Sequence, residues 1–256
     1  MLTLSNVAKT FEDGLLALDQ INLDVSAGEI VVVIGGSGCG KSTLLRVIAG
    51  LESATHGGVF VAGHPVTGPG ADVGVVFQEP RLMPWLTVEE NVRFGLASFS
   101  SDEAKSLANE ALARVGLSQF AEALPRQLSG GMAQRAAIAR ALVVKPPVLL
   151  LDEPFSALDA FTRLDLQEHL LDLWGWYRPT LLVVTHDIEE ALTLADRIVV
   201  MEGQPGRIAA EVAIDLARPR TRGDSTFNES RETVLAELSD ARPLEALGTT
   251  GVAPTR

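Results

Sequence analysis

The residues best suited to chemistry lie in a glycine-rich stretch near the N-terminus, within EIVVVIGGSGCGKSTLLRVIAG. Gly35, Gly40, Lys41 and Ser42 fit the pattern G-x-x-x-x-G-K-S between an apolar strand-like run and a helix-like run. Several backbone N–H groups can meet a polyphosphate at once only where no side chain blocks the approach, which favours glycine. We therefore predict a loop that binds ATP, with Lys41 reaching the β- and γ-phosphates and the Ser42 hydroxyl ligating Mg²⁺. The alternative is a glycine-rich turn without a ligand, and the flanking strand and helix argue against it.

Two acids end a second apolar run, in PVLLLDEPFSALD. Asp152 and Glu153 close a predicted buried strand, and Pro154 stops it. Alone, such acids would be solvated groups at a strand end, but beside a phosphate loop they complete a hydrolytic site. We expect Asp152 to hold Mg²⁺, directly or through water, and Glu153, which faces another direction, to polarise the attacking water.

Two further polar residues end strand-like runs. His186 closes TLLVVTH just before the helix-like DIEEAL, and Gln78 closes VGVVFQ. A lone histidine in such a place is more often structural than catalytic. Open α/β sheets, however, place their ligands at the carboxyl ends of their strands, which is the edge of the phosphate loop. We expect His186 to contact the γ-phosphate and Gln78 to contact Mg²⁺ or the attacking water.

The elements that must position these residues follow from apolar periodicity. In the first thirty residues, apolar and polar positions alternate around a turn at 12–14, which predicts a half-buried antiparallel sheet. Three later runs are apolar at successive positions, as in parallel strands buried between helix layers: EIVVVIG, PVLLLD and TLLVVTH. Helical spacing replaces these signals from 88 to 144, with a capping box at Thr87 and Glu90 and helices at 102–115 and 130–144. The prediction is an α/β fold, a P-loop NTPase core with a mainly parallel sheet, an antiparallel β subdomain and an inserted helical subdomain.

The C-terminal part of the sequence returns to short strand-like segments, GRIAAEV and the region around Ile214. A final short helix is predicted at 231–238, and the end, GTTGVAPTR, has little to bury and is predicted to be mobile. We assign residues 1–220 to one ATPase domain, with the helical subdomain at about 86–145, and residues 221–256 to a C-terminal extension.

Composition excludes several classes of function. The 256 residues carry a formal net charge of −12, which disfavours nucleic acid as a partner. Cys39 is the only cysteine, so an internal disulfide is excluded and a reducing compartment fits; we expect it to be a small residue in the wall of the phosphate loop. The longest apolar runs fall far short of the roughly 18 residues that cross a bilayer.

A second glycine turn precedes another helix in LSGGMAQRAAIARAL, and a helix N-terminus suits anions. Here the chain resembles the ATP-binding subunits of ABC transporters, whose signature motif reads LSGGQ; Met132 replaces the usual Gln. The resemblance runs from about residue 2 to about residue 220 with the motifs in the family's order. It implies that Ser129, Gly130 and Gly131 contact the phosphates of a nucleotide.

The resemblance also assigns a role to the other predicted site residues. Phe11 would stack on the adenine, although a core residue at an edge is the alternative, and Glu153 would be the catalytic base. Gln78 would form the Q-loop and His186 the switch histidine. Asp159, at the end of the D-loop Ser156–Asp159, would help to organise the nucleotide. The implied Walker A residues are Gly35, Gly36, Ser37, Gly38, Cys39, Gly40, Lys41, Ser42 and Thr43.

Family membership would imply partners as well. We expect a head-to-tail homodimer that holds two Mg-ATP between Walker A of one subunit and the signature of the other. Integral-membrane permease subunits would bind it, and a solute-binding protein would act indirectly. The expected location is peripheral, on the cytoplasmic face of the bacterial inner membrane. We expect Met83, Pro84 and Trp85 to lie in an exposed surface loop, where they would either form a socket for the permease or cap the helical lobe.

The solute is less constrained. QEPRLMPWLTV, DEPFSALDAFTR and PGRI resemble the importers of nitrate, sulfonates and taurine. Importers of thiamine precursors or bicarbonate, and a soluble ABC-type ATPase without a transport role, are the alternatives.

Overall fold

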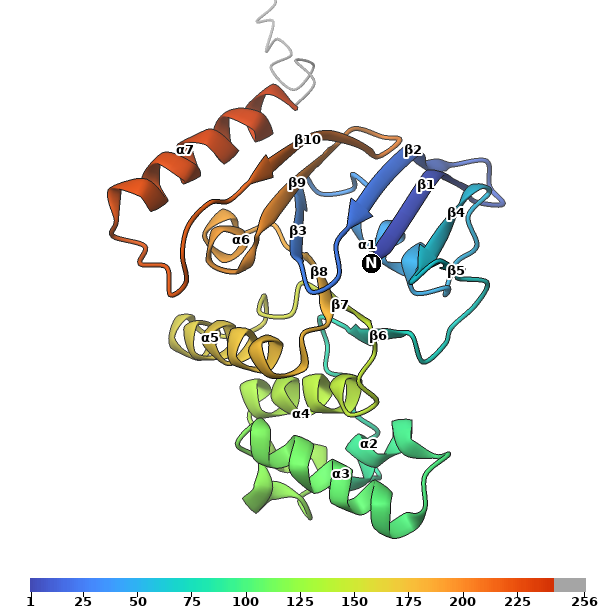
Figure 1. Ribbon diagram of the computed structural model, residues 1–256, viewed down its shortest axis with the longest axis vertical. Coiled ribbons are helices and arrows are strands. Elements are labelled where there is room, and N and C mark those ends of the chain that lie inside the picture. Colours follow the sequence, from blue (N-terminus) through green and yellow to red (C-terminus); the bar gives the residue numbers. More distant parts are fainter. Residues whose placement is uncertain (242–256) are drawn as a thin grey trace, which may run out of the picture.

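The computed structural model describes residues 1–241, which are built around a six-stranded sheet with the order β10-β9-β3-β8-β7-β6 (Figure 1). Strands β9 to β6 run parallel, and β10 pairs antiparallel with β9 at one edge. This confirms the predicted mainly parallel sheet. The strands are β3 (Ile30–Gly35), β6 (Val73–Val76), β7 (Val148–Asp152), β8 (Thr180–Val184), β9 (Arg197–Glu202) and β10 (Arg207–Ala213).

A second, four-stranded sheet has the order β2-β1-β4-β5 and is antiparallel throughout. It confirms the antiparallel subdomain that the alternation near the N-terminus predicts. Its strands are β1 (Leu2–Thr10), β2 (Leu16–Val25), β4 (His56–Val61) and β5 (His64–Pro65).

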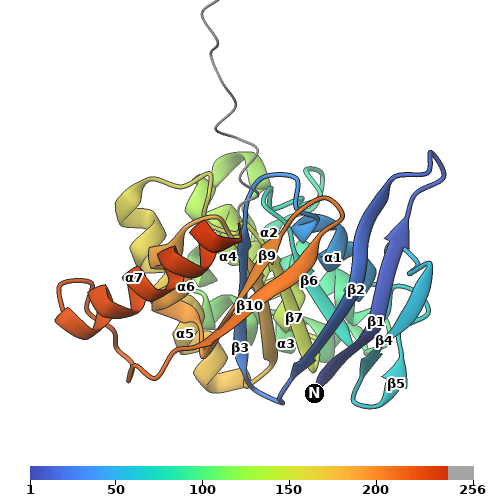
Figure 2. The same cartoon turned by 90° about the horizontal axis from the view of Figure 1, so that it is seen from above.

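Helix α1 (Lys41–Ile48) lies between the two sheets (Figure 2). Its Leu44 and Ile48 are fully buried and pack with Val31 and Val33 on one face of β3. Val32, on the other face, belongs to a second core formed with the remaining helices. Strands apolar on both faces are therefore explained by two cores, and each buried aliphatic side chain contributes about 1.5–3 kcal/mol.

The helical lobe, at the bottom of Figure 1, contains α2 (Val88–Arg93), α3 (Ser101–Arg114) and α4 (Gly130–Leu142). The capping box is confirmed, because the Thr87 N–H donates to Glu90 Oε2 over 2.7 Å and the Glu90 N–H donates to Thr87 Oγ1 over 3.2 Å. The two later helices match their predicted ranges within two residues. Three 3-10 segments join these helices: Phe94–Leu96, Ser118–Phe120 and Pro125–Gln127.

Helices α5 (Ala160–Tyr177) and α6 (Ile188–Leu194) cover the face of the large sheet opposite α1, and α7 (Ser225–Asp240) packs beside α6 and β10 (Figure 1). Helix α7 is longer than the predicted 231–238 because Phe227 and Val234 are buried along one stripe. The predicted strand around Ile214 is wrong: β10 ends at Ala213, and the Ile214 N–H donates to the Asp196 carbonyl.

The predicted mobile tail GTTGVAPTR lies outside the described residues. Among residues 1–241, no helix combines the length and the apolarity that crossing a bilayer requires.

Helix α7 provides a test of whether the extension belongs to the cooperative core. Phe227 is 2% exposed, so Phe227→Ala should lower the free energy of unfolding by about 3–5 kcal/mol, through lost burial and a residual cavity. The exposed Glu229→Ala on the same helix is the control and should stay within about 0.5 kcal/mol. Denaturant unfolding measures both, and equal effects would place α7 outside the core.

Candidate active site

The predicted phosphate loop, Glu153 and His186 meet at the carboxyl ends of β3, β7 and β8, the edge where open α/β sheets bind ligands. A cavity of about 310 Å³ lies there. Its lining residues are Ser37, Gly38, Gly40, Lys41, Ser42, Thr43, Glu153 and His186.

Lys41 closes the phosphate loop on itself. Its ammonium donates to the Gly35 carbonyl over 2.9 Å and to the Gly36 carbonyl over 3.0 Å, and Cys39 Sγ lies 3.8 Å away. Lys41 is 8% exposed and begins α1, whose first N–H groups have no partner within the helix. The loop thus presents a cation and a helix N-terminus to the same cavity, which suits a polyphosphate. Cys39 is buried beneath the loop, as expected of a wall residue.

Glycine is required in the loop by crowding from neighbouring strands. A Cβ on Gly40 would lie 2.8 Å from Leu18 Cδ2 and 2.9 Å from the Ala17 carbonyl oxygen, and Gly40 has a φ of 92°. A Cβ on Gly35 would lie 2.3 Å from the Met201 carbonyl oxygen. The ends of β2 and β9 therefore clamp the loop, and only glycine fits the clamp.

The turn between β9 and β10 completes this clamp, and sequence reasoning missed it. Gln204 Nε2 donates to the Gly38 carbonyl over 3.2 Å. Gly206 lies so close that a Cβ there would meet the Cys39 carbonyl oxygen at 2.1 Å, and its N–H donates to the Ala17 carbonyl. An amide and a glycine in a turn carry no chemical signal of their own, so only the three-dimensional contact reveals this support.

Ser42 and Asp152 approach each other as a cation-binding pair would. Ser42 Oγ lies 3.4 Å from Asp152 Oδ1, and burial raises the pKa of the Asp152 carboxyl, which the Ser42 hydrogen bond partly opposes. A hard divalent cation favours such oxygen ligands and would offset this cost of burial. In residues 1–241 no group of three His, Cys, Asp or Glu side chains could hold a metal alone. The pair therefore fits Mg²⁺ only if phosphates and water supply its other ligands.

Glu153 is turned out of line with the strand that precedes it. Its φ of 43° is unusual for a residue other than glycine and costs about 1–3 kcal/mol. The Glu153 N–H donates to the Val184 carbonyl over 2.9 Å, and Oε1 lies 3.3 Å from Nδ1 of His186. The turn thus brings a carboxylate and an imidazole together at one wall of the cavity, where they can act on a proton.

Gln78 is exposed, lies two residues beyond β6 and is not part of the cavity wall. The segment around it is attached to α4 of the helical lobe. Gln134 Nε2 donates to the Phe77 carbonyl over 3.2 Å, and Arg140 donates to the Pro80 and Arg81 carbonyls over 2.9 and 2.8 Å. A movement of the lobe would therefore carry this segment with it.

Phe11 lies in the turn between β1 and β2 and is half-buried. The Lys9 ammonium is 5.0 Å from the centroid of its ring, and Phe11 does not line the cavity. Its proposed role on the adenine stays a prediction.

The signature residues lie outside the cavity of their own chain. Ser129 caps α4 by accepting from the Met132 N–H over 3.3 Å, and both Ser129 and Gly130 are exposed. Gly131 is buried. It packs so closely against α5 that a Cβ at this position would lie 2.5 Å from Thr162 Cγ2. The glycine that the signature needs is thus also required by the packing of α4 on α5.

Asp159 also lies outside this cavity and caps α5. It accepts from the N–H groups of Phe161 and Thr162, both over 3.1 Å, and from Thr162 Oγ1 over 2.6 Å. The hydrogen bond from the Thr162 hydroxyl, above all, lowers the pKa of the exposed Asp159 carboxyl. The acid that ends the D-loop is therefore ionised and fixed in place.

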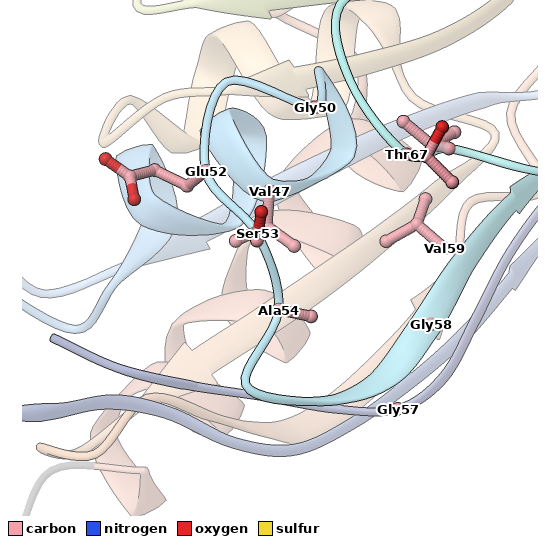
Figure 3. A pocket seen from close by; sticks show the side chains of 10 residues that line it. Val47, Gly50, Glu52, Ser53, Ala54, Gly57, Gly58, Val59 and Thr67 are labelled. Atoms are coloured by element: carbon pink, nitrogen blue, oxygen red, sulfur yellow. The ribbon is translucent and has the colours of Figure 1, made fainter.

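Another hollow, of about 180 Å³, lies at the opposite end of α1 (Figure 3). Val47, Gly50 and Val59 contribute to its wall. Its acid, Glu52, pairs with Lys9 over 2.9 Å, so no free acid is left there for chemistry.

Comparison with known proteins agrees with this geometry. The family model described as ABC transporter matches residues 18–156. An uncharacterised ABC transporter ATP-binding protein of Methanocaldococcus jannaschii is 50% identical over 93% of this chain and 91% of its own length. The aliphatic sulfonates import ATP-binding protein SsuB of Bacillus subtilis is 46% identical over 92% of each chain.

Solved structures show the same fold. A dimeric post-hydrolysis state of the ATP-binding cassette MJ0796, bound to ADP and Pi, matches with a TM-score of 0.74 and 36% identity, over 85% of this chain and 100% of that one. The cbiO1 protein of Clostridium perfringens, part of the ABC transporter complex cbiONQ, matches with a TM-score of 0.78 and 27% identity, over 93% and 94% of the chains.

The contact between Gly131 and Thr162 predicts a paired effect on stability. Gly131→Ala should destabilise the protein by about 1–3 kcal/mol because the new methyl group overpacks the contact between α4 and α5. Thr162→Ser removes Cγ2 but keeps a hydroxyl for Asp159, so the double variant should recover most of the loss in denaturant unfolding.

Gly130→Ala is the matched control, since its Cβ would lie 3.5 Å from Leu158, an ordinary contact. Equal stability of the two alanine variants, or no recovery with Thr162→Ser, would show that this packing does not require the glycine.

Proposed function

The chain belongs to the ABC transporter family, and from this membership we propose that two copies close head to tail around two Mg-ATP molecules to power solute import through a separate membrane permease. The chain is an ATPase whose hydrolysis is coupled to transport. We propose a small anion as the solute, such as a sulfonate, taurine or nitrate.

One observation carries the proposal of a dimer: the cavity is lined by the phosphate loop, Glu153 and His186, whereas the signature and D-loop residues lie outside it. Ser129 and Asp159 are exposed and do not line the cavity of their own chain. A second copy in head-to-tail arrangement would bring its signature over this cavity. The dimeric state of the related cassette that carries ADP and Pi supports the arrangement.

In the proposed reaction, the P-loop backbone and Lys41 hold the phosphates while a water attacks the γ-phosphorus. The bond from this phosphorus to the bridging oxygen breaks, and the products are ADP and inorganic phosphate. Glu153 accepts the proton of the attacking water, and His186 hydrogen-bonds the γ-phosphate. Ser42 and Asp152 would hold Mg²⁺, which supplies positive charge beside the phosphates; Gln78 would join them when the helical lobe moves.

A surface on the helical lobe suits the permease. Buried Asn91 fixes the loop before α2, since it accepts from the Met83 N–H over 2.7 Å and donates to the Met83 carbonyl over 3.1 Å. Trp85, on this loop, is 73% exposed, and Pro84 beside it in sequence is exposed as well. Exposed apolar side chains on a loop that is fixed in place favour a partner over a mere cap. We infer a peripheral location on the cytoplasmic face of the inner membrane.

The similarity to the aliphatic sulfonates import ATP-binding protein of Bacillus subtilis supports sulfonates as the solute class, and we propose a solute-binding protein as the indirect partner. Purified permease and binding protein, reconstituted with this chain in liposomes, test the proposal. Uptake of a radiolabelled alkanesulfonate that depends on ATP and on this chain is expected. ATP-dependent uptake of another solute, with none of sulfonate, taurine or nitrate, would contradict the solute class.

Glu153→Gln provides the sharpest test of the proposed base. The amide keeps the shape of the side chain but cannot accept the proton, so kcat should fall by a factor of about 10² or more while ATP binding is retained. The variant should accumulate as an ATP-bound dimer in size-exclusion chromatography with light scattering. Glu229→Gln, exposed on α7, is the control. Turnover near that of the wild type would remove Glu153 from its role.

A further inference from the structure

Behind the Glu153 and His186 pair lies a cluster of charged side chains that the proposed reaction does not use: Arg163 on α5, and Asp187 and Glu190 at the start of α6. We propose that Arg163 is a positioning residue that couples the D-loop of the chain to the switch histidine of the same chain. The inference rests on the proposed hydrolysis at this site. It adds a route by which contacts at the D-loop change the position of His186.

The guanidinium of Arg163 connects the two loops directly. Nη2 donates to the carbonyl of Leu158 in the D-loop over 3.3 Å, and Nη1 donates to Asp187 Oδ2, also over 3.3 Å. Its Nε is buried and has no hydrogen-bond partner in the part of the chain that the structure describes. A planar guanidinium with two occupied ends transmits a displacement better than a flexible ammonium can.

Asp187 is itself fixed firmly. Oδ1 accepts from the N–H groups of Glu189 and Glu190 over 2.9 and 3.1 Å, which caps α6. The Asp187 N–H donates to Thr185 Oγ1 over 3.1 Å. Asp187 and Thr185 flank His186 in sequence, so the Arg163 contact holds the backbone on both sides of the imidazole.

Glu190 is the buried member of the cluster. It is 3% exposed, its Oε1 has no hydrogen-bond partner among residues 1–241, and its carboxyl forms a side-chain hydrogen bond with Thr185. Burial, with repulsion from Asp187, raises the pKa of Glu190 to about 8, so the carboxyl is neutral at pH 7. The charged groups that face it are Asp187, Arg163 and Glu153. Ionisation of Glu190 would place a third negative charge beside those of Asp187 and Glu153, with only the Arg163 guanidinium to balance them.

The cluster differs from ordinary packing between two helices. Arg222 also bridges these helices, because Nη1 donates to Glu189 on α6 over 3.0 Å and Nη2 donates to Gln167 on α5 over 3.2 Å. Within residues 1–241, the hydrogen bonds of the Arg222 side chain go to neither the D-loop nor Asp187. It therefore offers a matched arginine whose loss tests helix bridging alone.

The neighbours of Leu158 in the D-loop, Ala157 and Asp159, are exposed, whereas the other end of the link, Asp187, adjoins His186, which lines the cavity. In the proposed dimer the D-loop faces the partner subunit. A partner that displaces the Leu158 carbonyl would move Arg163, then Asp187, and so alter how His186 lies against Glu153. Arrival of the partner would thereby adjust the catalytic pair before any contact with the nucleotide.

Three variants of the full chain test the link, with kcat, KM and ATP affinity measured for each. Arg163→Met should lower kcat by about tenfold or more and change the Kd for ATP by less than about twofold, because the link acts on chemistry and not on binding. Arg163→Lys, which keeps the charge but not the fork, should recover only part of the rate. Arg222→Met should lose thermal stability to a similar degree and keep kcat.

The pH profile supplies a readout that a purely structural role would not move. Wild-type kcat should decline as pH rises through about 8, where Glu190 ionises. Glu190→Gln is permanently neutral, so it should match the wild type at pH 7 and lose that part of the decline.

The link is overturned if Arg163→Met keeps its kcat, if it loses ATP binding in parallel with kcat, or if Arg222→Met loses as much rate. An unchanged alkaline limb in Glu190→Gln would also count against it. Failure of the proposed dimer can be distinguished from failure of the Arg163 link. If the ATPase rate per subunit of the wild type did not depend on protein concentration, the dimer alone would be rejected. The contacts of Arg163 are all within one chain, so its effect on kcat would still be decided.

Discussion

The site depends on backbone N–H groups that bind a polyphosphate. A loop can present several such groups at once only if it carries few side chains and is held rigid. Lys41 contributes to both conditions, because its ammonium closes the loop on two carbonyls and still faces the cavity. The ends of β2 and β9 and the β9–β10 turn crowd the loop from behind, so Gly35, Gly40 and Gly206 have no room for a Cβ. The antiparallel sheet therefore supports the phosphate loop from behind, although none of the residues in its strands lines the cavity.

The position of the loop then constrains what surrounds it. Parallel strands deliver their carboxyl ends to one edge, which places Asp152, Glu153 and His186 beside the loop. Asp152 continues the strand and is half-buried, whereas the positive φ of Glu153 turns the next acid toward the imidazole. The same turn leads into the D-loop and α5, whose Arg163 reaches back to α6. A few residues of backbone thus connect the two acids beside the phosphate loop, Asp152 and Glu153, to the D-loop that follows them.

Much of this could be predicted from the sequence, because strand and helix periodicity, the capping box at Thr87 and the phosphate-loop pattern are local signals. Helix α7 was predicted too short because the burial of Phe227 depends on a surface that distant elements form. Gln204 and Arg163 carry no local signal, because their contacts with Gly38 and Asp187 join residues that are 166 and 24 positions apart. The burial of Glu190 likewise depends on the elements that pack around it. The signature residues show the limit of a single chain: within residues 1–241 they lie outside the cavity that the phosphate loop lines, so their contact with a phosphate depends on a second subunit.

Complementation between two inactive chains tests the composite site most directly. Lys41→Ala removes the lysine of the phosphate loop. Ser129→Glu places a negative charge where the partner's phosphates would lie, and an acid is tolerated at this position because it suits the N-terminus of α4. In a head-to-tail dimer, a mixed pair has one site with both defects and one intact site. Each variant alone should be inactive, and an equimolar mixture should regain ATPase activity toward about a quarter of the wild-type level, since half of randomly formed dimers are mixed. An inactive mixture, in which mixed dimers are shown to form, would contradict a site shared between subunits.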